Sequence, residues 1–213
     1  MVDARERTLP LLDALVGLFP GGAVQRGVTV GCTGPAAVSL AMAVAAGPVC
    51  AGSWAAMAGM PALGLRAVTE LGVAADRLVL VGEPPGGLDA GRWADAVAAM
   101  IDGFDVVVLG PRLRMRAAVA RRLQSRAQSR GAVLVTAGVL DGFGCDLQLA
   151  SGAQQWDGLG DGHGVATARR VEVELRGRRV PRPQRTVLWL PDAAGVLRAE
   201  TAEAEITRLA RTG

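Results

Sequence analysis

The sequence predicts an α/β fold with a mostly parallel twisted sheet and helices on both faces. Short apolar runs alternate with helical segments as far as residue 144, which is the pattern of right-handed βαβ units. Beyond that point strands follow one another without helices, which predicts an antiparallel edge hairpin near the C-terminus. The chain has 213 residues, half of them apolar, and this length favours one domain with a sizeable core.

The elements of the parallel part follow from apolar runs and the residues that interrupt them. Val28–Thr33 is an apolar strand that Gly34–Pro35 ends, and Ala36–Ala46 is predicted as a helix that Gly47–Pro48 ends. The remaining expected elements are strand Val49–Met57, helix Ala62–Leu71, strand Leu78–Val81, helix Trp93–Ile101, strand Asp105–Leu109, helix Arg114–Arg130 and strand Ala132–Ala137.

The C-terminal third has a different organisation. We expect strands at Asp146–Ala150, Arg170–Arg176 and Thr186–Leu190, paired antiparallel at one edge of the sheet. A polar, weakly amphipathic helix is expected over Leu197–Arg211. The sequence therefore predicts a single core domain over residues 1–191 and a short polar helical tail over residues 192–213.

The composition excludes several kinds of site. All 23 basic residues are arginine, so no mechanism that requires a lysine is open to this chain. His163 is the single histidine, which excludes any site built on two of them. The net charge of +3 is compatible with contacts to nucleic acid but does not require them.

Cysteine usage and hydropathy indicate a reduced cytoplasmic protein. Cys32, Cys50 and Cys145 are odd in number and far apart, which argues against a disulfide framework or a metal site. Charged residues near the N-terminus argue against a signal peptide. Residues 27–65 carry no charge, but glycines and prolines divide this stretch, so we expect a buried core and no membrane anchor.

Several strings resemble the RecA group of proteins. The run Pro20–Gly27, followed by a strand, a glycine turn and a helix, resembles the segment that leads into the P-loop of RecA. The strings Trp156–Gly160 and Val187–Pro191 resemble the short actinobacterial ImuA-type proteins of the RecA/SulA-like group. The resemblance covers residues 9–191 and implies a RecA-like core.

The segment in the P-loop position lacks the residues that bind phosphate and magnesium. A working P-loop reads GxxxxGK[ST], in which the lysine neutralises phosphate and the hydroxyl holds the metal. Here the segment begins with Gly31 and contains Gly34, but Ala37 takes the lysine position and Val38 the hydroxyl position. Ser39 comes one residue late, and Pro35 removes an amide.

The carboxylates that assist hydrolysis are missing as well. No Asp or Glu lies between Asp13 and Glu70, although the resemblance places a water-orienting carboxylate within Ala55–Gly59. The strand that would carry a magnesium-bridging aspartate ends in Leu109-Gly110-Pro111. Ala137-Gly138 replaces the polar switch residue of the next strand. We therefore expect no ATP hydrolysis, no catalytic residue, no cofactor and no metal.

Two arginine clusters and the tail are candidate contact surfaces. One cluster surrounds the predicted helix Arg114–Arg130, where residues four apart share a face, and the other decorates the late hairpin. The alternative is a solvated face in a chain that uses arginine wherever others use lysine. The candidate partner or DNA contacts are Arg114, Arg122, Arg126, Arg130, Arg178, Arg179, Leu197, Ile206 and Leu209.

The resemblance to ImuA-type proteins implies a function. Those proteins are accessory factors of damage-induced translesion synthesis that associate with ImuB, a catalytically silent relative of Y-family polymerases. A non-catalytic adaptor that binds an ImuB-like partner is therefore expected. Three alternatives stay open: an ATP-binding regulatory switch, a DNA-binding accessory module with weak backbone contacts, and a SulA-like inhibitor of cell division. Self-association is a further expected mode of contact.

Overall fold

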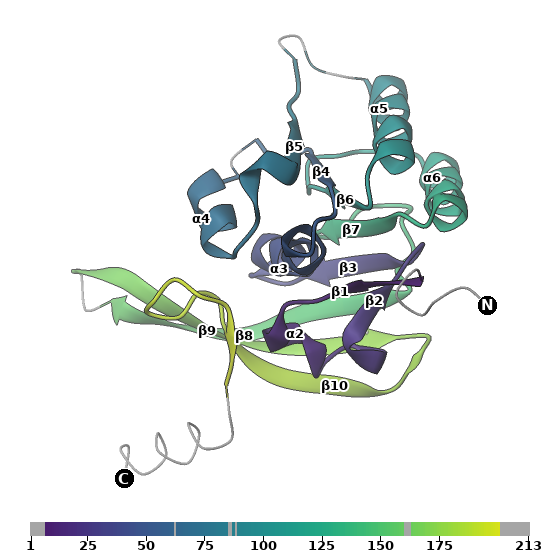
Figure 1. Ribbon diagram of the computed structural model, residues 1–213. Helices are drawn as coiled ribbons and strands as arrows, with labels where there is room; N and C mark the ends of the chain where they lie inside the picture. Colours follow the sequence, from purple (N-terminus) through teal and green to yellow (C-terminus); the bar gives the residue numbers. More distant parts are fainter. Residues whose placement is uncertain (1–6, 62, 85–86, 88, 160–162, 201–213) are drawn as a thin grey trace.

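The computed structural model describes residues 7–61, 63–84, 87, 89–159 and 163–200 (Figure 1). Within this part of the chain, a small antiparallel sheet pairs β1 (Thr8–Pro10) with β2 (Ala23–Gln25). Nine further strands form one sheet in the order β11-β10-β9-β8-β3-β7-β6-β4-β5. Short helices lie at α2 (Asp13–Val16), η1 (Pro20–Gly22), α4 (Leu65–Glu70) and η2 (Ala75–Arg77).

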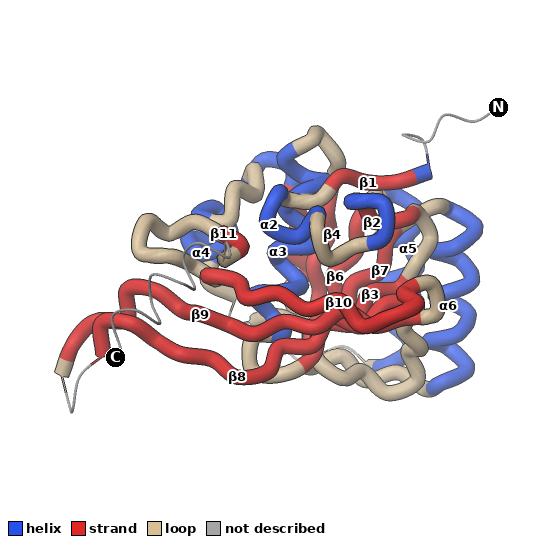
Figure 2. The backbone as a smooth tube through the Cα atoms, turned by 90° about the horizontal axis from the view of Figure 1, so that it is seen from below, coloured by secondary structure: helices blue, strands red, loops and turns tan. Residues whose placement is uncertain are grey.

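The parallel half of the large sheet confirms the predicted α/β class. Its strands are β3 (Thr29–Thr33), β4 (Ala55–Ala58), β5 (Leu78–Val81), β6 (Val106–Leu109) and β7 (Val133–Ala137). Helix α3 (Ala37–Cys50) packs on one face, and helices α5 (Ala90–Gly103) and α6 (Ala117–Arg130) pack on the other (Figures 1 and 2).

Side chains that alternate along each strand fill two cores. On β6, Val106 and Val108 join the core beneath α3, whereas Val107 and Leu109 join the core beneath α5 and α6. All four are buried. This arrangement explains why the strand is apolar at every position: each face of a parallel sheet is covered by helices.

Helix α3 continues through the residues that were predicted to end it. Pro48 lies inside the last turn and the helix runs to Cys50, so the prediction of an end at Gly47–Pro48 was wrong. A Cβ at Gly47 would lie 2.6 Å from the Cα of Leu11. The glycine therefore permits close packing of the N-terminal segment rather than helix termination. Strand β4 consequently begins at Ala55, later than predicted.

The C-terminal strands switch the sheet from parallel to antiparallel. Strand β8 (Leu147–Leu159) pairs parallel with β3 and antiparallel with β9 (Gly164–Gly177), which pairs antiparallel with β10 (Val180–Trp189). The predicted antiparallel pairing of the late strands is confirmed, and β8 in addition pairs parallel with β3. The outer parts of β8 and β9 extend beyond the rest of the sheet as a two-stranded arm (Figures 1 and 2).

The beginning of the predicted tail helix is a strand. Arg198–Ala199 form β11, which pairs with the end of β10. Arg170 Nη2 lies 2.5 Å from Glu200 Oε2, and the two side chains are 14% and 6% exposed. Residues up to Glu200 therefore pack on the core, and Leu197 contributes an apolar contact to it. Ile206 and Leu209 lie outside the described residues.

Helix α6 begins at Ala117, so Arg114 precedes it and the predicted helical start at Arg114 was wrong. Arg116 occupies the N-cap position in an extended conformation.

Within the described residues, no helix combines the length and the apolar character that crossing a bilayer requires.

Candidate functional site

The turn between β3 and α3 is the segment that the sequence places in the P-loop position, and we call Gly31–Ser39 the cradle turn. It packs directly against β8. Gly34 has a φ of +86°, and a Cβ at this residue would lie 2.1 Å from the backbone oxygen of Ser151. A left-handed conformation and this close approach both require glycine. Gly34 thus allows the cradle turn to pack against β8.

The amides at the start of α3 are bonded within the protein. Ala36 N donates to Ser151 Oγ at 2.9 Å, and the same hydroxyl donates to the carbonyl oxygen of Thr33 at 2.9 Å. Ala37 N donates to the carbonyl oxygen of Gly34 at 3.1 Å, and Pro35 has no N–H. A helix N-terminus binds phosphate through free amides. Here residues 35–37 offer no free amide to a phosphate, because two of the amides are bonded and the proline has none.

Arg169 of β9 reaches the same turn from the other side. Its Nη2 donates to Ser39 Oγ at 2.7 Å, and its Nε donates to the carbonyl oxygen of Leu190 at 2.9 Å. The guanidinium carbon lies 5.1 Å from the centroid of the Trp156 ring, a cation–π distance. Burial lowers the pKa of Arg169, but an arginine remains charged at neutral pH.

The residues that follow β4 and β6 are packed backbone to backbone, at the positions where a hydrolytic enzyme of the RecA type carries carboxylates. Gly110 N donates to the carbonyl oxygen of Ala58 at 2.7 Å. A Cβ at Gly110 would lie 2.2 Å from the backbone oxygen of Gly59, so no side chain fits there. The neighbouring cavity of about 280 Å³ has a mainly apolar lining that includes Val38, Met60 and Arg112.

Two of the three arginines predicted to share a face of α6 form ion pairs with α5. Arg126 and Arg130 both form ion pairs with Asp102, the latter at 3.0 Å. The Arg126 guanidinium, followed by Arg130, lowers the pKa of Asp102. Arg122 is exposed on the same face. The structure thus brings these three candidates together, but it engages two of them in intramolecular pairs.

The other candidates lie in separate places. Arg114 Nη1 donates to the carbonyl oxygen of Pro111 at 2.9 Å. Arg178 and Arg179 form the turn between β9 and β10, where Arg179 donates to Gln25 Oε1. Leu197 packs against the core near β11. Among the candidates that the structure describes, no single surface unites all of them.

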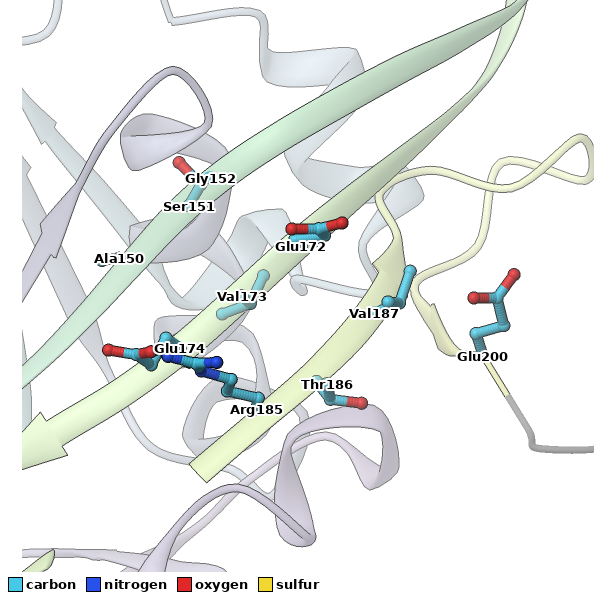
Figure 3. A pocket seen from close by; sticks show the side chains of 10 residues that line it. All are labelled: Ala150, Ser151, Gly152, Glu172, Val173, Glu174, Arg185, Thr186, Val187 and Glu200. Carbon is cyan, nitrogen blue, oxygen red and sulfur yellow. Dashed lines mark hydrogen bonds and ion pairs between the residues drawn. The ribbon is translucent and has the colours of Figure 1, made fainter. Parts of the chain in front are cut away.

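A cavity of about 760 Å³ lies over β8, β9 and β10 (Figure 3). Figure 3 shows Glu174 and Arg185 directed toward each other, and Arg185 Nε donates to Glu174 Oε2 at 2.6 Å. Arg176 and Arg185 lower the pKa of Glu174. Glu200 is paired with Arg170. Arginines therefore compensate two of the three carboxylates in the described lining, and Glu172 is the third.

The arm carries exposed apolar side chains instead. Leu159 is 56% exposed and Val165 is 75% exposed, close to the end of the two strands, and Trp156 is 40% exposed nearer the body. Exposed apolar residues that occur singly need no explanation, whereas large contiguous apolar patches are typical of interaction sites. The arm was not predicted, because the expected strands ended at Ala150 and began again at Arg170, whereas β8 and β9 continue to Leu159 and start at Gly164.

Sequence reasoning also missed the residues that close the cradle turn. Ser151 lies in a strand with no motif around it, and Arg169 was one of many arginines in the late hairpin. Both act on residues more than one hundred positions away. The spacing of residues along the chain holds no information on such contacts.

A family model described as the MT3502 N-terminal domain matches residues 17–142, more than half of the chain. The chain belongs to this family. The uncharacterized protein Rv3395c of Mycobacterium tuberculosis is 34% identical over 151 residues, and the alignment covers 66% of this chain and 70% of that protein. The MT3502 domain match includes the cradle turn and α6 but ends before β8. Ser151, Arg169 and the arm therefore lie beyond the matched segment.

Proposed function

We propose that this protein is a non-catalytic adaptor of the ImuA type, with a RecA-like core, that holds an ImuB-like partner in a translesion-synthesis complex. The observation that carries the non-catalytic part is the closed cradle turn. The amide of Ala36 donates a hydrogen bond to Ser151 Oγ, and Arg169 donates one to the hydroxyl of Ser39. The partner's identity rests on the sequence resemblance.

The chemistry of phosphoryl transfer supports this proposal. Catalysis of that reaction depends on cations and oriented donors that stabilise the charge on the transferring group. This chain has no lysine, and the ends of β4 and β6 offer no carboxylate to hold magnesium. To bind a phosphate, the cradle turn has to give up its buried hydrogen bonds to β8, and each such loss costs about 1–3 kcal/mol.

The arm supports the adaptor part. It presents Leu159 and Val165 on a projecting ribbon, and a two-stranded ribbon offers both side chains and free backbone groups to a partner. The base of the arm is held by Arg169, which contacts α3, the end of β10 and Trp156. A rigid base and an apolar end suit a surface that docks a protein.

Co-purification of the full chain with an ImuB-like protein tests the proposal. We expect binding that falls at least about tenfold in the variant Leu159→Ser/Val165→Thr, because lost apolar contacts at an interface centre cost more than about 1 kcal/mol each. Leu65→Ser/Val139→Thr is the matched control, since Leu65 and Val139 are also exposed but lie off the arm. Absence of binding by the wild-type chain contradicts the proposal, and equal losses in both variants contradict the arm as the docking site.

A nucleotide-binding regulator is the second candidate, and Arg169 is the observation that favours it. Its guanidinium lies beside the start of α3, where it is positioned to meet a phosphate after leaving Ser39. Calorimetric titration with ATP and magnesium separates the two functions. Tight, magnesium-dependent binding favours the regulator, and the absence of binding heat favours the adaptor.

A further inference from the structure

A cavity of about 570 Å³ opens at the opposite edge of the sheet from the cradle turn. It lies where β3 and β8 begin, between α6 and the turn that joins β9 to β10. We call this cavity the basic groove. Its charged lining residues are Arg26, Arg121, Arg178, Arg179 and Asp146.

The positive charges of the basic groove are only partly compensated. Arg26 Nη1 lies 2.8 Å from Asp105 Oδ1, so that pair is neutral. Arg179 donates to the neutral amide oxygen of Gln25. Arg121 and Arg178 have no ion pair with any carboxylate of the described residues. In the described lining, Asp146 is therefore the one carboxylate beside three guanidinium groups that lack an ion pair, and it accepts a hydrogen bond from Thr29 N.

Helix α6 separates its arginines between two faces. Arg122, Arg126 and Arg130 follow one another at intervals of four, and Asp102 of α5 forms ion pairs with the last two. Arg121 lies on the stripe with Ser125 and Gln128 that lines the groove. Among the described residues, Arg121 therefore adds an unpaired positive charge to the groove, from a face of α6 separate from the one that carries Arg122, Arg126 and Arg130.

Gly27 brings the segment before β3 against this stripe. Its φ is +80°, and a Cβ there would lie 3.0 Å from the Cα of Gln128. Since only glycine combines this conformation with so close an approach, the floor of the groove is built into the fold. The groove therefore does not depend on a mobile side chain for its shape.

We propose that the basic groove binds the phosphate backbone of nucleic acid. Arginine guanidinium groups bind phosphate oxygens through paired N–H donors, and Ser125 and Gln128 add neutral donors of the kind that contact phosphates. None of the side chains that line the described groove is aromatic. Base stacking is therefore absent, and recognition is independent of sequence.

An acidic protein segment fits the groove less well. Protein interfaces depend on apolar and aromatic anchors at their centre, whereas this lining is polar with small apolar residues. The exposed apolar side chains Leu159 and Val165 lie on the arm, at the other end of the molecule from α6 (Figure 2). The assignment of the groove to nucleic acid does not depend on the adaptor function or on which partner docks at the arm.

Fluorescence anisotropy with a labelled duplex and the matching single strand, over a range of salt concentrations, tests this inference on the full chain. In Arg121→Glu/Arg178→Glu we expect the Kd to rise about tenfold or more and the slope of log K against log salt to become shallower by about two. Arg122→Glu/Arg182→Glu changes the net charge equally outside the groove and is expected to change the Kd less than about twofold.

Three results overturn the inference. They are no binding by the wild-type chain at low salt, equal losses in the two double variants, and tighter binding of a poly-glutamate peptide than of DNA of equal charge. The last result assigns the groove to an acidic protein. Thermal unfolding verifies that each variant is folded, and Arg121→Gln/Arg178→Gln, with the same expected direction, replaces the charge reversal if that variant does not fold.

Discussion

Arg169 Nη2 donates a 2.7 Å hydrogen bond to Ser39 Oγ, although the two residues are 130 positions apart in the chain. This bond joins the base of the arm to the start of α3. It also engages the hydroxyl that lies one residue after the position where a P-loop holds its metal. The contact links the fold of the C-terminal hairpin to the chemistry that the cradle turn has lost.

The bond between Arg169 and Ser39 predicts a measurable coupling. Arg169→Met is expected to lower the free energy of unfolding by about 2 kcal/mol, because hydrogen bonds from a charged group contribute about 1.5–3 kcal/mol. A double-mutant cycle with Ser39→Ala, followed by urea unfolding, is expected to give an interaction energy above about 0.5 kcal/mol. Additive effects contradict a direct bond between the two side chains.

Gly34 is predicted to be irreplaceable for a steric reason. Gly34→Ala is expected to destabilise the protein by about 3 kcal/mol or more, since it combines a left-handed backbone with overpacking against β8. Gly52→Ala is the control: Gly52 has a φ of +101°, but a Cβ there meets no atom within 4 Å. Its expected cost is about 1–2 kcal/mol. Thermal and urea unfolding compare the two, and equal costs exclude the clash with Ser151.

The paired Asp102 predicts a dependence of stability on pH. Arg126 and Arg130 lower its pKa from the ordinary 3.8, so the pairs stabilise the folded state above that value and lose their effect as the pH falls through the lowered pKa. Asp102→Asn is expected to be less stable than wild type at pH 7, with a difference that shrinks below pH 3.8. Urea unfolding at several pH values measures this.

Asp95→Asn provides the control for Asp102, because Asp95 is an exposed carboxylate on the same helix. Its replacement is expected to change stability by less than about 0.5 kcal/mol. A difference between wild type and Asp102→Asn that stays constant down to acid pH contradicts the ion pairs as the source of the effect.

The buried pair of Arg170 and Glu200 predicts that the chain up to β11 belongs to the stable core. Glu200→Gln is expected to cost about 3 kcal/mol, because removal of one partner leaves a buried charge. Arg170→Met/Glu200→Gln removes both charges and is expected to cost less than the sum of the single changes. Unfolding curves of the three variants test this. If Glu200→Gln is as stable as wild type, residues 192–200 do not contribute to the core.

Local pattern was sufficient for much of the fold. Strand β6 is apolar at every position because helices cover both faces of the sheet there, and strand β5 has the predicted bounds Leu78–Val81. The wrong boundary at Gly47–Pro48 has a different origin. Glycine and proline usually end a helix, but here the glycine makes room for Leu11, and a tertiary contact overrides the local preference.

The candidate site was less predictable than the fold. The sequence alone shows which residue types are missing, so the lack of lysine and of nearby carboxylates could be established without the structure. The spacing of Arg122, Arg126 and Arg130 correctly placed them on one face. It did not reveal that this face meets Asp102, because an ion pair between helices depends on how the helices pack.

The α/β class, the chemistry missing from the cradle turn and the position of the late hairpin follow from the order and type of residues alone. They depend on periodicity and on local conformational preference, which act over a few neighbours. Long-range packing assigns Ser151 and Arg169 to the cradle turn and joins Arg121 to Arg178 across the basic groove. Those pairings are between residues tens to more than one hundred positions apart, and only the folded chain brings them within contact distance.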